Sequence, residues 1–190
     1  MRITGGVHAG RRLVAPRTGV RPTADRVREA LFAMLGAAVD GARVLDLFAG
    51  SGAVGLEAWS RGAARVVWVE SRRTALAALR RNAATLGIEQ PSVRAVDVMT
   101  ALRRVSGAEC FDLVFADPPY AWGAEDRGAR GSWPALLRAI REGGWLAPAG
   151  VLSIEVDARR PTPRAAGWRD VDRRTYGGTS LVLYTMGDEA

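Results

Sequence analysis

DLFAGSGAVG, residues 46–55, is the stretch that decides the fold, because it reads as a turn between a buried strand and a helix. The apolar run at residues 43–47 predicts the strand, and residues 53–61 predict the helix. Gly50, Gly52 and Gly55 satisfy the G-x-G-x-x-G spacing of cofactor-binding turns. Ligands of open parallel sheets bind at this kind of strand end. This segment, the glycine loop, is therefore predicted to bind a cofactor.

Strand-like and helix-like runs alternate outward from the glycine loop. Further strands are predicted at residues 65–70, 93–98, 111–116 and 151–156, and helices at 73–86 and 133–142. Repeated β-then-α units of this length predict a parallel sheet covered on both faces. The tail differs, because Trp168–Thr175 and Ser180–Tyr184 are joined by a glycine pair without a helix. These two runs predict an antiparallel hairpin at the sheet edge.

Residues 1–20 form a basic arm, with four arginines and no acidic residue. Its glycines bound Val7-His8-Ala9 and Leu13-Val14-Ala15, which predicts a β-hairpin. A helix is predicted next, with Thr23 as a candidate N-cap and Gly36 as its stop. We therefore expect a small extension at residues 1–40 and a main α/β domain at residues 41–190.

Length and composition exclude several classes of protein. The 190 residues suit one α/β core, and the net charge of +7 makes nucleic acid the leading partner class. There is no bilayer-spanning apolar run and no signal-peptide pattern, so a cytoplasmic protein without membrane association is expected. A single cysteine, Cys110, excludes an intramolecular disulfide, and the single histidine, His8, lies in no metal-ligand pattern.

Two cofactors suit the glycine loop, NAD and S-adenosylmethionine, and Asp46 discriminates between them. A carboxylate at the strand end would repel a pyrophosphate, whereas it can accept a hydrogen bond from the ammonium of S-adenosylmethionine. Glu70 is expected to accept from the ribose hydroxyls, and Asp97 from the adenine amine. Helix capping is the alternative role for both aspartates. The full set predicted to bind cofactor is Asp46, Phe48, Ala49, Gly50, Ser51, Gly52, Glu70, Ser71, Asp97, Val98 and Asp117.

A second chemical motif, Asp117-Pro118-Pro119-Tyr120, follows the predicted strand at residues 111–116. Methylation of an exocyclic base amine requires acceptors that hold its N–H groups and direct the nitrogen lone pair at the methyl group. Asp117 supplies a carboxylate and Pro118 a backbone carbonyl, while Pro118 and Pro119 bring no competing N–H. Tyr120 can stack on the base, a contact worth about 1–3 kcal/mol. These four residues are the predicted catalytic set.

The chain resembles the RsmD-type methyltransferases, which modify the N2 amine of a guanine in bacterial 16S rRNA. The resemblance covers nearly the whole chain. It lies in Arg2–Gly6, Gly10–Leu13, Arg21–Phe32, Asp46–Gly52, Val69-Glu70, Asp117–Tyr120, Gly144–Leu146 and Tyr176-Gly177. One departure is a long glycine-rich loop at residues 121–132, where Trp122 is a candidate base contact and a lid is one interpretation.

This resemblance implies a class I methyltransferase with a Rossmann-like seven-stranded sheet. It also implies guanine 966 as substrate, presented on the assembled 30S subunit. We expect the enzyme to be a monomer. The arginines expected near RNA are Arg11, Arg12, Arg21, Arg26 and Arg28, the last two with acidic partners as the alternative. Three other interpretations stay open at this point: an adenine-N6 or DNA methyltransferase, an NAD-dependent oxidoreductase, and a non-catalytic RNA-binding protein.

Overall fold

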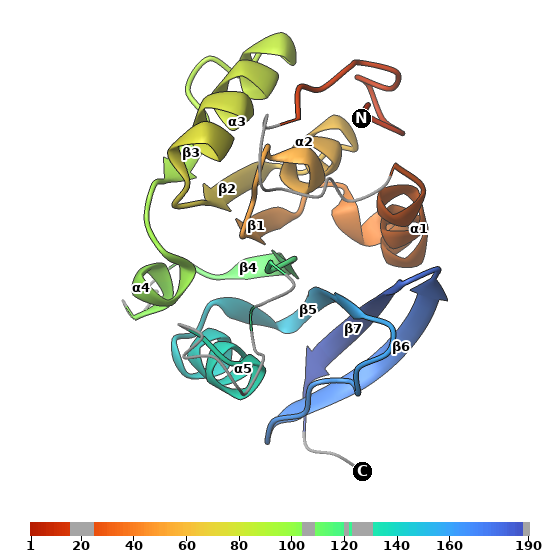
Figure 1. Cartoon of the computed structure of the whole chain (residues 1–190), viewed down its shortest axis with the longest axis vertical. Helices are drawn as coiled ribbons and strands as arrows, with labels where there is room; N and C mark the ends of the chain where they lie inside the picture. Colours follow the sequence, from red (N-terminus) through yellow and green to blue (C-terminus); the bar gives the residue numbers. More distant parts are fainter. Residues whose placement is uncertain (16–24, 104–108, 120–121, 123–130, 188–190) are drawn as a thin grey trace. The chain divides into compact units, whose positions relative to one another are not determined.

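The computed structural model describes residues 1–15, 25–103, 109–119, 122 and 131–187. Within them, seven strands make up a mixed sheet accompanied by helices (Figure 1), which confirms the predicted α/β class. The chain divides into two compact units, Met1–Val98 and Met99–Ala190, and each is described by itself. The basic arm belongs to the first unit, together with the glycine loop. The expected boundary at residue 40 does not coincide with the limit between these units.

The first unit contains three parallel strands in the order β3-β2-β1. Strand β1 covers the same residues as predicted, and α2 and α3 end one residue before their predicted limits. Helix α1 ends at Leu35, just before Gly36 as expected, and a 3₁₀ helix begins at Gly36 itself. The elements are α1 (Asp25–Leu35), η1 (Gly36–Val39), β1 (Arg43–Leu47), α2 (Ala53–Ser60), β2 (Arg65–Val69), α3 (Arg73–Thr85) and β3 (Ser92–Arg94).

The third strand is shorter than the sequence indicated. The apolar run predicted a strand to Val98, but β3 ends at Arg94 and the helix α4 (Val98–Leu102) begins where the strand was expected to end. Short apolar runs do not distinguish strand from helix by periodicity.

None of the described helices is both long enough and apolar enough to cross a membrane.

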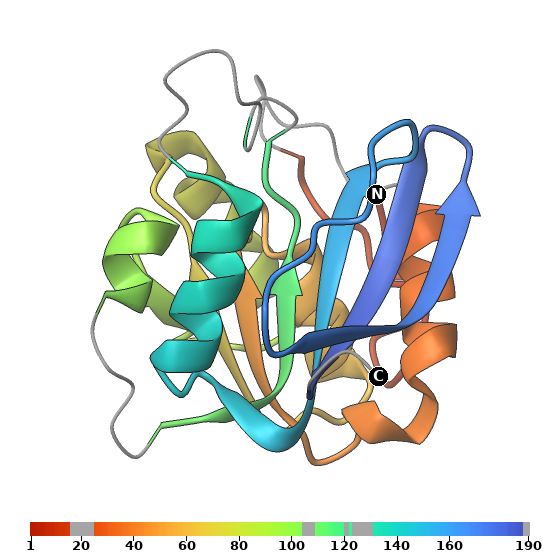
Figure 2. The ribbon, with the colours of Figure 1, turned by 90° about the horizontal axis from the view of Figure 1, so that it is seen from below.

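The second unit is built on long strands, in the order β4-β5-β7-β6 (Figure 2). Strand β4 pairs with β5 in parallel, and β7 pairs antiparallel with both β5 and β6. The predicted C-terminal hairpin is therefore confirmed, with Gly177-Gly178 at its turn. The Ser132 hydroxyl caps α5 by accepting a hydrogen bond from the Ala135 N–H at 3.3 Å. The elements are β4 (Phe111–Ala116), α5 (Trp133–Glu142), β5 (Leu146–Asp157), β6 (Trp168–Tyr176) and β7 (Thr179–Met186).

The basic arm turns back on itself, but not with the strands that the sequence predicted. Its two limbs meet at a single antiparallel bridge between Arg2 and Arg12. The Ile3 N–H donates to the Arg11 carbonyl at 2.9 Å, and the Leu13 N–H donates to the Met1 carbonyl at 3.0 Å. The expected strand at residues 7–9 is wrong, because those residues form the turn. The predicted N-cap Thr23 lies outside the described residues.

Candidate cofactor and substrate site

The glycine loop holds its backbone in conformations that most residues avoid. Gly50 and Gly52 have positive φ angles of 57° and 80°, and Phe48 has a φ of 57°. A non-glycine residue there costs about 1–3 kcal/mol, and such strain concentrates at binding sites. A Cβ atom at Gly52 would lie 2.9 Å from Leu79 Cγ, so α3 packs directly against the loop. The sequence spacing predicted this tight turn correctly.

Asp46 lies at the end of β1 and is only 3% exposed. Its Oδ2 accepts a hydrogen bond from the Gly55 N–H at 2.9 Å, which ties the strand to the first turn of α2. Gly55 allows this close approach, because a Cβ there would lie 2.3 Å from Trp68 Nε1 on β2. The capping role considered for Asp46 is therefore present. Its contact with a cofactor ammonium stays a prediction.

Glu70 follows β2 and connects the glycine loop to the segment that leads into α3. Its Oε2 accepts from the Gly50 N–H at 2.8 Å, and its Oε1 accepts from the N–H groups of Ser71 and Arg72, both at 2.8 Å. Burial raises the pKa of this carboxyl, but hydrogen bonds from Arg72 and Gly50 outweigh burial and hold the pKa below 4.5. Glu70 is therefore ionised at neutral pH, and a ribose would have to share its oxygens with these donors.

The start of α2 offers donors to an anion. The N–H groups of Ser51, Ala53 and Val54 donate to no other described residue. Such unpaired donors at a helix N-terminus favour a carboxylate or phosphate. They therefore suit the carboxylate of an amino-acid moiety, as the sequence analysis expected. No group of three or more His, Cys, Asp or Glu side chains in the described part of the chain could hold a metal ion.

The other residues predicted to bind cofactor have differing exposure. Phe48 and Ala49 are half-buried in the glycine loop, and Ser71 is exposed beside Glu70. Asp97 is exposed and immediately precedes α4, whereas Val98 is buried in the first turn of that helix. Asp97 is therefore placed as a helix cap would be, three residues beyond β3. Its contact with an adenine amine stays a prediction.

The second predicted motif lies in the second unit, directly after β4. Asp117 and Pro118 are half-buried, and Pro119 is exposed. The Pro118 carbonyl accepts no hydrogen bond from a described residue, whereas the Pro119 carbonyl accepts one from the Trp122 N–H at 2.7 Å. This difference agrees with the expectation that Pro118 supplies the backbone acceptor. Tyr120 lies outside the described residues, as does most of the loop 121–132.

Trp122 itself packs within the second unit. Its ring contacts that of Trp133 in α5 edge to face, with a centroid distance of 5.3 Å. A Cβ at Gly131 would lie 2.4 Å from the Trp122 ring, so the glycine leaves room for that ring. Trp122 therefore has a packing role, and its role as a base contact stays a prediction.

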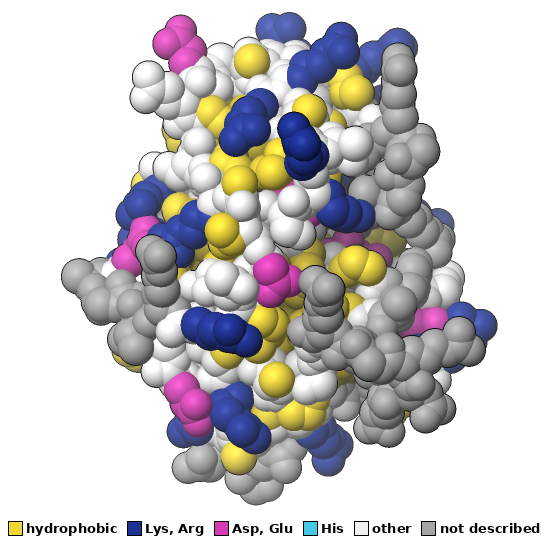
Figure 3. Space-filling model, turned by 60° about the vertical axis from the view of Figure 1, so that its left-hand side comes forward, with side chains coloured by type: hydrophobic (Ala, Val, Ile, Leu, Met, Phe, Trp, Pro, Cys, Tyr) yellow, Lys and Arg dark blue, Asp and Glu magenta, His cyan; other side chains and the backbone are white. Residues whose placement is uncertain are grey.

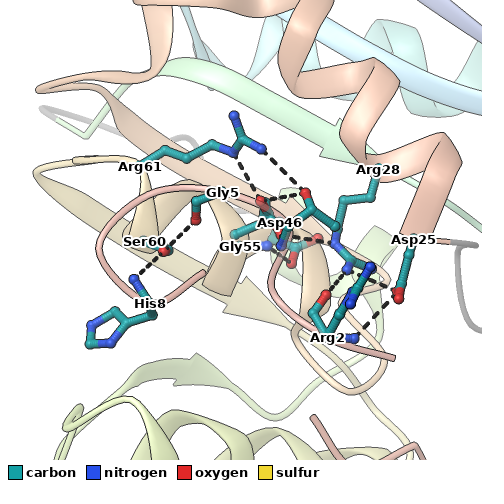
Figure 4. A network of polar contacts seen from close by, with 11 residues as sticks. Arg2, Gly5, His8, Asp25, Arg28, Asp46, Gly55, Ser60 and Arg61 are labelled. Atoms are coloured by element: carbon teal, nitrogen blue, oxygen red, sulfur yellow. Dashed lines mark hydrogen bonds and ion pairs between the residues drawn. The ribbon is translucent and has the colours of Figure 1, made fainter. Parts of the chain in front are cut away.

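The basic arm is held by buried side chains of the first unit (Figure 4). Glu57 on α2 has no exposed side-chain surface. Its carboxylate accepts hydrogen bonds from the Thr4 N–H at 2.8 Å and from the Thr4 hydroxyl at 2.7 Å. Its carboxylate also pairs with Arg28 at 3.2 Å and with Arg61 at 2.9 Å. One turn further along α2, the Ser60 hydroxyl donates to the Gly5 carbonyl at 2.6 Å.

Arg28 is the one predicted RNA contact that the structure corrects. Its side chain is completely buried, and it donates to Glu57, to Asp25 at 3.1 Å and to the Arg2 carbonyl. A guanidinium so enclosed is not available to a phosphate, so the acidic partners named as the alternative are the correct interpretation. Arg11, Arg12 and Arg26 are exposed, and Arg21 lies outside the described residues. Further exposed arginines, Arg73, Arg80 and Arg81, lie on α3, where Figure 3 shows basic side chains gathered on the surface.

Sequence reasoning missed Asn82, a fully buried residue of α3. Its Nδ2 donates to the Ser51 carbonyl in the glycine loop and to the Val14 carbonyl in the basic arm, both at 3.0 Å. Its Oδ1 accepts from the Val14 N–H at 2.8 Å. A signal was present, since Asn82 follows Ala75, Leu76 and Leu79 at helical spacing on the apolar face. A polar residue on such a face requires buried partners.

Two curated relatives match this chain over most of their lengths. "Ribosomal RNA small subunit methyltransferase D" of Escherichia coli K12 is 35% identical over 186 residues, which cover 97% of this chain and 89% of that protein. The protein of the same name from Haemophilus influenzae is 33% identical, with coverage of 97% and 93%. Among solved structures, "Putative methyltransferase yhhF from Escherichia coli" is 34% identical, with a TM-score of 0.84 and coverage of 100% and 99%.

Fold, glycine loop and relatives together define the class of protein: this is an S-adenosylmethionine-dependent methyltransferase of the class I fold. The chain belongs to the family described as "Conserved hypothetical protein 95", whose model matches residues 1–185. The expected RsmD-type resemblance is therefore confirmed. The alternatives of an NAD-dependent oxidoreductase and of a non-catalytic RNA-binding protein are rejected.

Proposed function

We propose that this enzyme methylates the exocyclic N2 amine of a guanine in bacterial 16S rRNA, guanine 966 in the customary numbering. The relatives named for methylation of small-subunit rRNA support the substrate class. The observation that supports this reaction is the position of Asp117-Pro118 directly after β4. The Pro118 carbonyl accepts no hydrogen bond from any described residue. We further propose that the enzyme acts as a cytoplasmic monomer on the assembled 30S subunit.

The chemistry requires positioning rather than a nucleophilic side chain. S-adenosylmethionine supplies an electrophilic methyl group on its sulfonium. The amine nitrogen forms a bond to the methyl carbon, the carbon–sulfur bond breaks, and the amine loses one proton. Asp117 and the Pro118 carbonyl accept the two N–H groups, so that the nitrogen lone pair points at the methyl group, and the Asp117 carboxylate takes the released proton. Correct orientation of two reactants lowers such a barrier by about 7–11 kcal/mol in favourable cases.

Radiolabelled S-adenosylmethionine and undermethylated 30S subunits test this proposal. The wild-type protein is expected to label the subunit, and Asp117→Ala is expected to reduce labelling by about 100-fold or more while cofactor binding by calorimetry persists. Asp170→Ala, at an exposed acid on β6, is the matched control and should label normally. Absence of label in every RNA and DNA offered would overturn the proposal.

One alternative acceptor has the same geometric requirements. An adenine N6 amine also presents two N–H groups, so an Asp-Pro-Pro-Tyr site can hold either base. Mass spectrometry of nucleosides after the reaction separates the two outcomes. N2-methylguanosine supports the proposal, whereas N6-methyladenosine would replace the guanine with an adenine.

A further inference from the structure

We propose that Asn82 is a positioning residue that couples the basic arm to the glycine loop, so that cofactor binding and RNA binding strengthen one another. The proposal rests on the proposed function, since the cofactor and the RNA are the two ligands that it links. Its basis is one side chain that forms hydrogen bonds with two separate segments. The Asn82 amide holds the Ser51 carbonyl of the glycine loop and both backbone groups of Val14 in the basic arm.

The contacts of Asn82 leave it little freedom. Its side chain is completely buried, both hydrogens of Nδ2 are donated, and Oδ1 accepts a hydrogen bond. Breaking either link would leave buried polar groups unpaired, so both links resist disruption. A shift of the Ser51 peptide therefore moves or breaks the contact with Val14, and the reverse holds equally.

Ser51 is where a ligand would act on this link. Its own N–H is among those with no described partner at the start of α2, while its carbonyl is held by Asn82. A carboxylate bound at these N–H groups would fix the orientation of the Ser51-Gly52 peptide. Gly52 has a φ of 80° and no side chain to resist rotation, so this peptide depends on its hydrogen bonds.

The other end of the link lies in the arginine-bearing segment. Val14 follows the exposed Arg11 and Arg12 closely, and the Leu13 N–H returns to the Met1 carbonyl at 3.0 Å. Fixing Val14 therefore fixes the limb that carries both arginines. The basic arm thus becomes better ordered for phosphate contact when the glycine loop is occupied. Thermodynamic linkage requires the same factor in the opposite direction.

Amide hydrogen exchange on the full chain, with and without saturating S-adenosylhomocysteine, tests the coupling without RNA. In the wild-type protein the ligand is expected to slow exchange of residues 1–15 by about 5-fold or more, the lower end of common coupling factors. Asn82→Asp keeps the side-chain shape but removes both donors, and should abolish this slowing while calorimetry still detects the ligand. Asn82→Leu is a second variant in case a buried carboxylate impairs folding.

Ser60→Ala is the matched control, since the Ser60 hydroxyl anchors the basic arm through Gly5 and His8, and among the described residues it forms no hydrogen bond with the glycine loop. Its arm amides should exchange faster at baseline but keep the ligand-dependent slowing. Failure of the wild-type protein to bind S-adenosylhomocysteine would contradict the proposed function itself. Binding without slowing at residues 1–15, or equal slowing in both Asn82 variants, would overturn the coupling alone.

With RNA present, the same coupling has a second readout. S-adenosylhomocysteine should tighten binding of undermethylated 30S subunits by about 5-fold in the wild-type protein and in Ser60→Ala, but not in Asn82→Asp. If Asn82 had a purely structural role, its substitution would weaken the binding of both ligands without changing the factor by which one ligand strengthens the binding of the other. An unchanged factor in Asn82→Asp would therefore contradict the proposal.

Discussion

The two ends of the chain are both extended segments, but they are held by different kinds of contact. The C-terminal hairpin is held by backbone: β7 pairs with β6 at eight positions and with β5 at six. The basic arm has a single bridge, between Arg2 and Arg12, with a few backbone hydrogen bonds around it, and most of its contacts with the helices α1, α2 and α3 are made by their side chains.

This difference decides how each segment can be perturbed. A backbone ladder spreads its stabilisation over many residues, and a substituted side chain leaves it intact. Side-chain anchors concentrate stabilisation in a few buried groups, and one substitution removes several contacts at once. The basic arm should therefore be sensitive to single substitutions far from it in sequence, and the hairpin should not.

The largest effect is expected from Glu57→Gln. This change leaves the fully buried Arg28 without its carboxylate, and loss of one member of a buried pair costs about 3–5 kcal/mol. Because Asp25 still pairs with Arg28 at 3.1 Å, we expect a loss at the lower end of this range, a decrease of about 3 kcal/mol in the free energy of unfolding. Urea denaturation measures this decrease. Asp172→Asn, in an exposed pair with Arg174, is the control. Equal losses in the two variants would contradict the difference between the ends.

Ser60→Ala should have the second-largest effect on stability. It removes the donor to the Gly5 carbonyl at 2.6 Å and the acceptor of the His8 N–H at 2.9 Å. Partly buried groups left without partners cost about 1–2 kcal/mol. Urea denaturation measures the loss, and hydrogen exchange should locate it in the basic arm. A loss spread evenly over the chain would argue against a local anchor.

A comparable polar pair in the hairpin should matter less. Thr175 and Ser180 face one another across β6 and β7 with hydroxyl oxygens 2.8 Å apart. Thr175→Ala removes this cross-strand contact but leaves the ladder, so a loss of about 0.2–1 kcal/mol is expected in the same denaturation assay. A loss larger than that of Ser60→Ala would reverse the ranking of the two ends.

The smallest effect is expected at Asp157, at the end of β5. Hydrogen bonds from the Arg159 guanidinium and N–H hold the pKa of Asp157 below its ordinary value of 3.8. The ionised form is therefore favoured in the folded state, and its contribution is present above pH 3.8 and lost as the pH falls below that value. Arg159 is 87% exposed, so solvent screens the pair.

The matching measurement compares wild-type protein with Asp157→Asn across pH. Their difference in unfolding free energy should be small and constant near neutrality and should shrink toward zero below pH 3.8. A difference that grows on acidification would mean that Asp157 is destabilised, not favoured, as a carboxylate.

Local patterns were sufficient to predict most of the fold. The bounds of β1, β4 and α5 agree with the predicted ranges, because each is a short apolar run or helical stripe bounded by turn residues. The strand predicted to Val98 was wrong, since its end carries no local punctuation that separates strand from helix. The turn at residues 7–9 was mistaken for a strand because Val7 is β-prone although it is highly exposed.

The glycine loop could be predicted because its chemistry is local in sequence, within Asp46–Gly55. The anchors of the basic arm could not, since Thr4 and Glu57 are 53 positions apart and Val14 and Asn82 are 68 apart. No periodicity links such pairs. Arg28 was therefore counted among the RNA-facing arginines, although its charge is neutralised inside the first unit.

The enclosed carboxylate of Glu57 also decides how the basic arm can be studied. Deleting the arm would remove Thr4 and the Arg2 carbonyl, and would open Glu57 and Arg28 to water. A truncated protein that fails to bind RNA would then report damage to α2 as readily as a lost contact. Charge reversal at the exposed Arg11 and Arg12 leaves these anchors in place, and so separates the role of the arm in recognition from its role in folding.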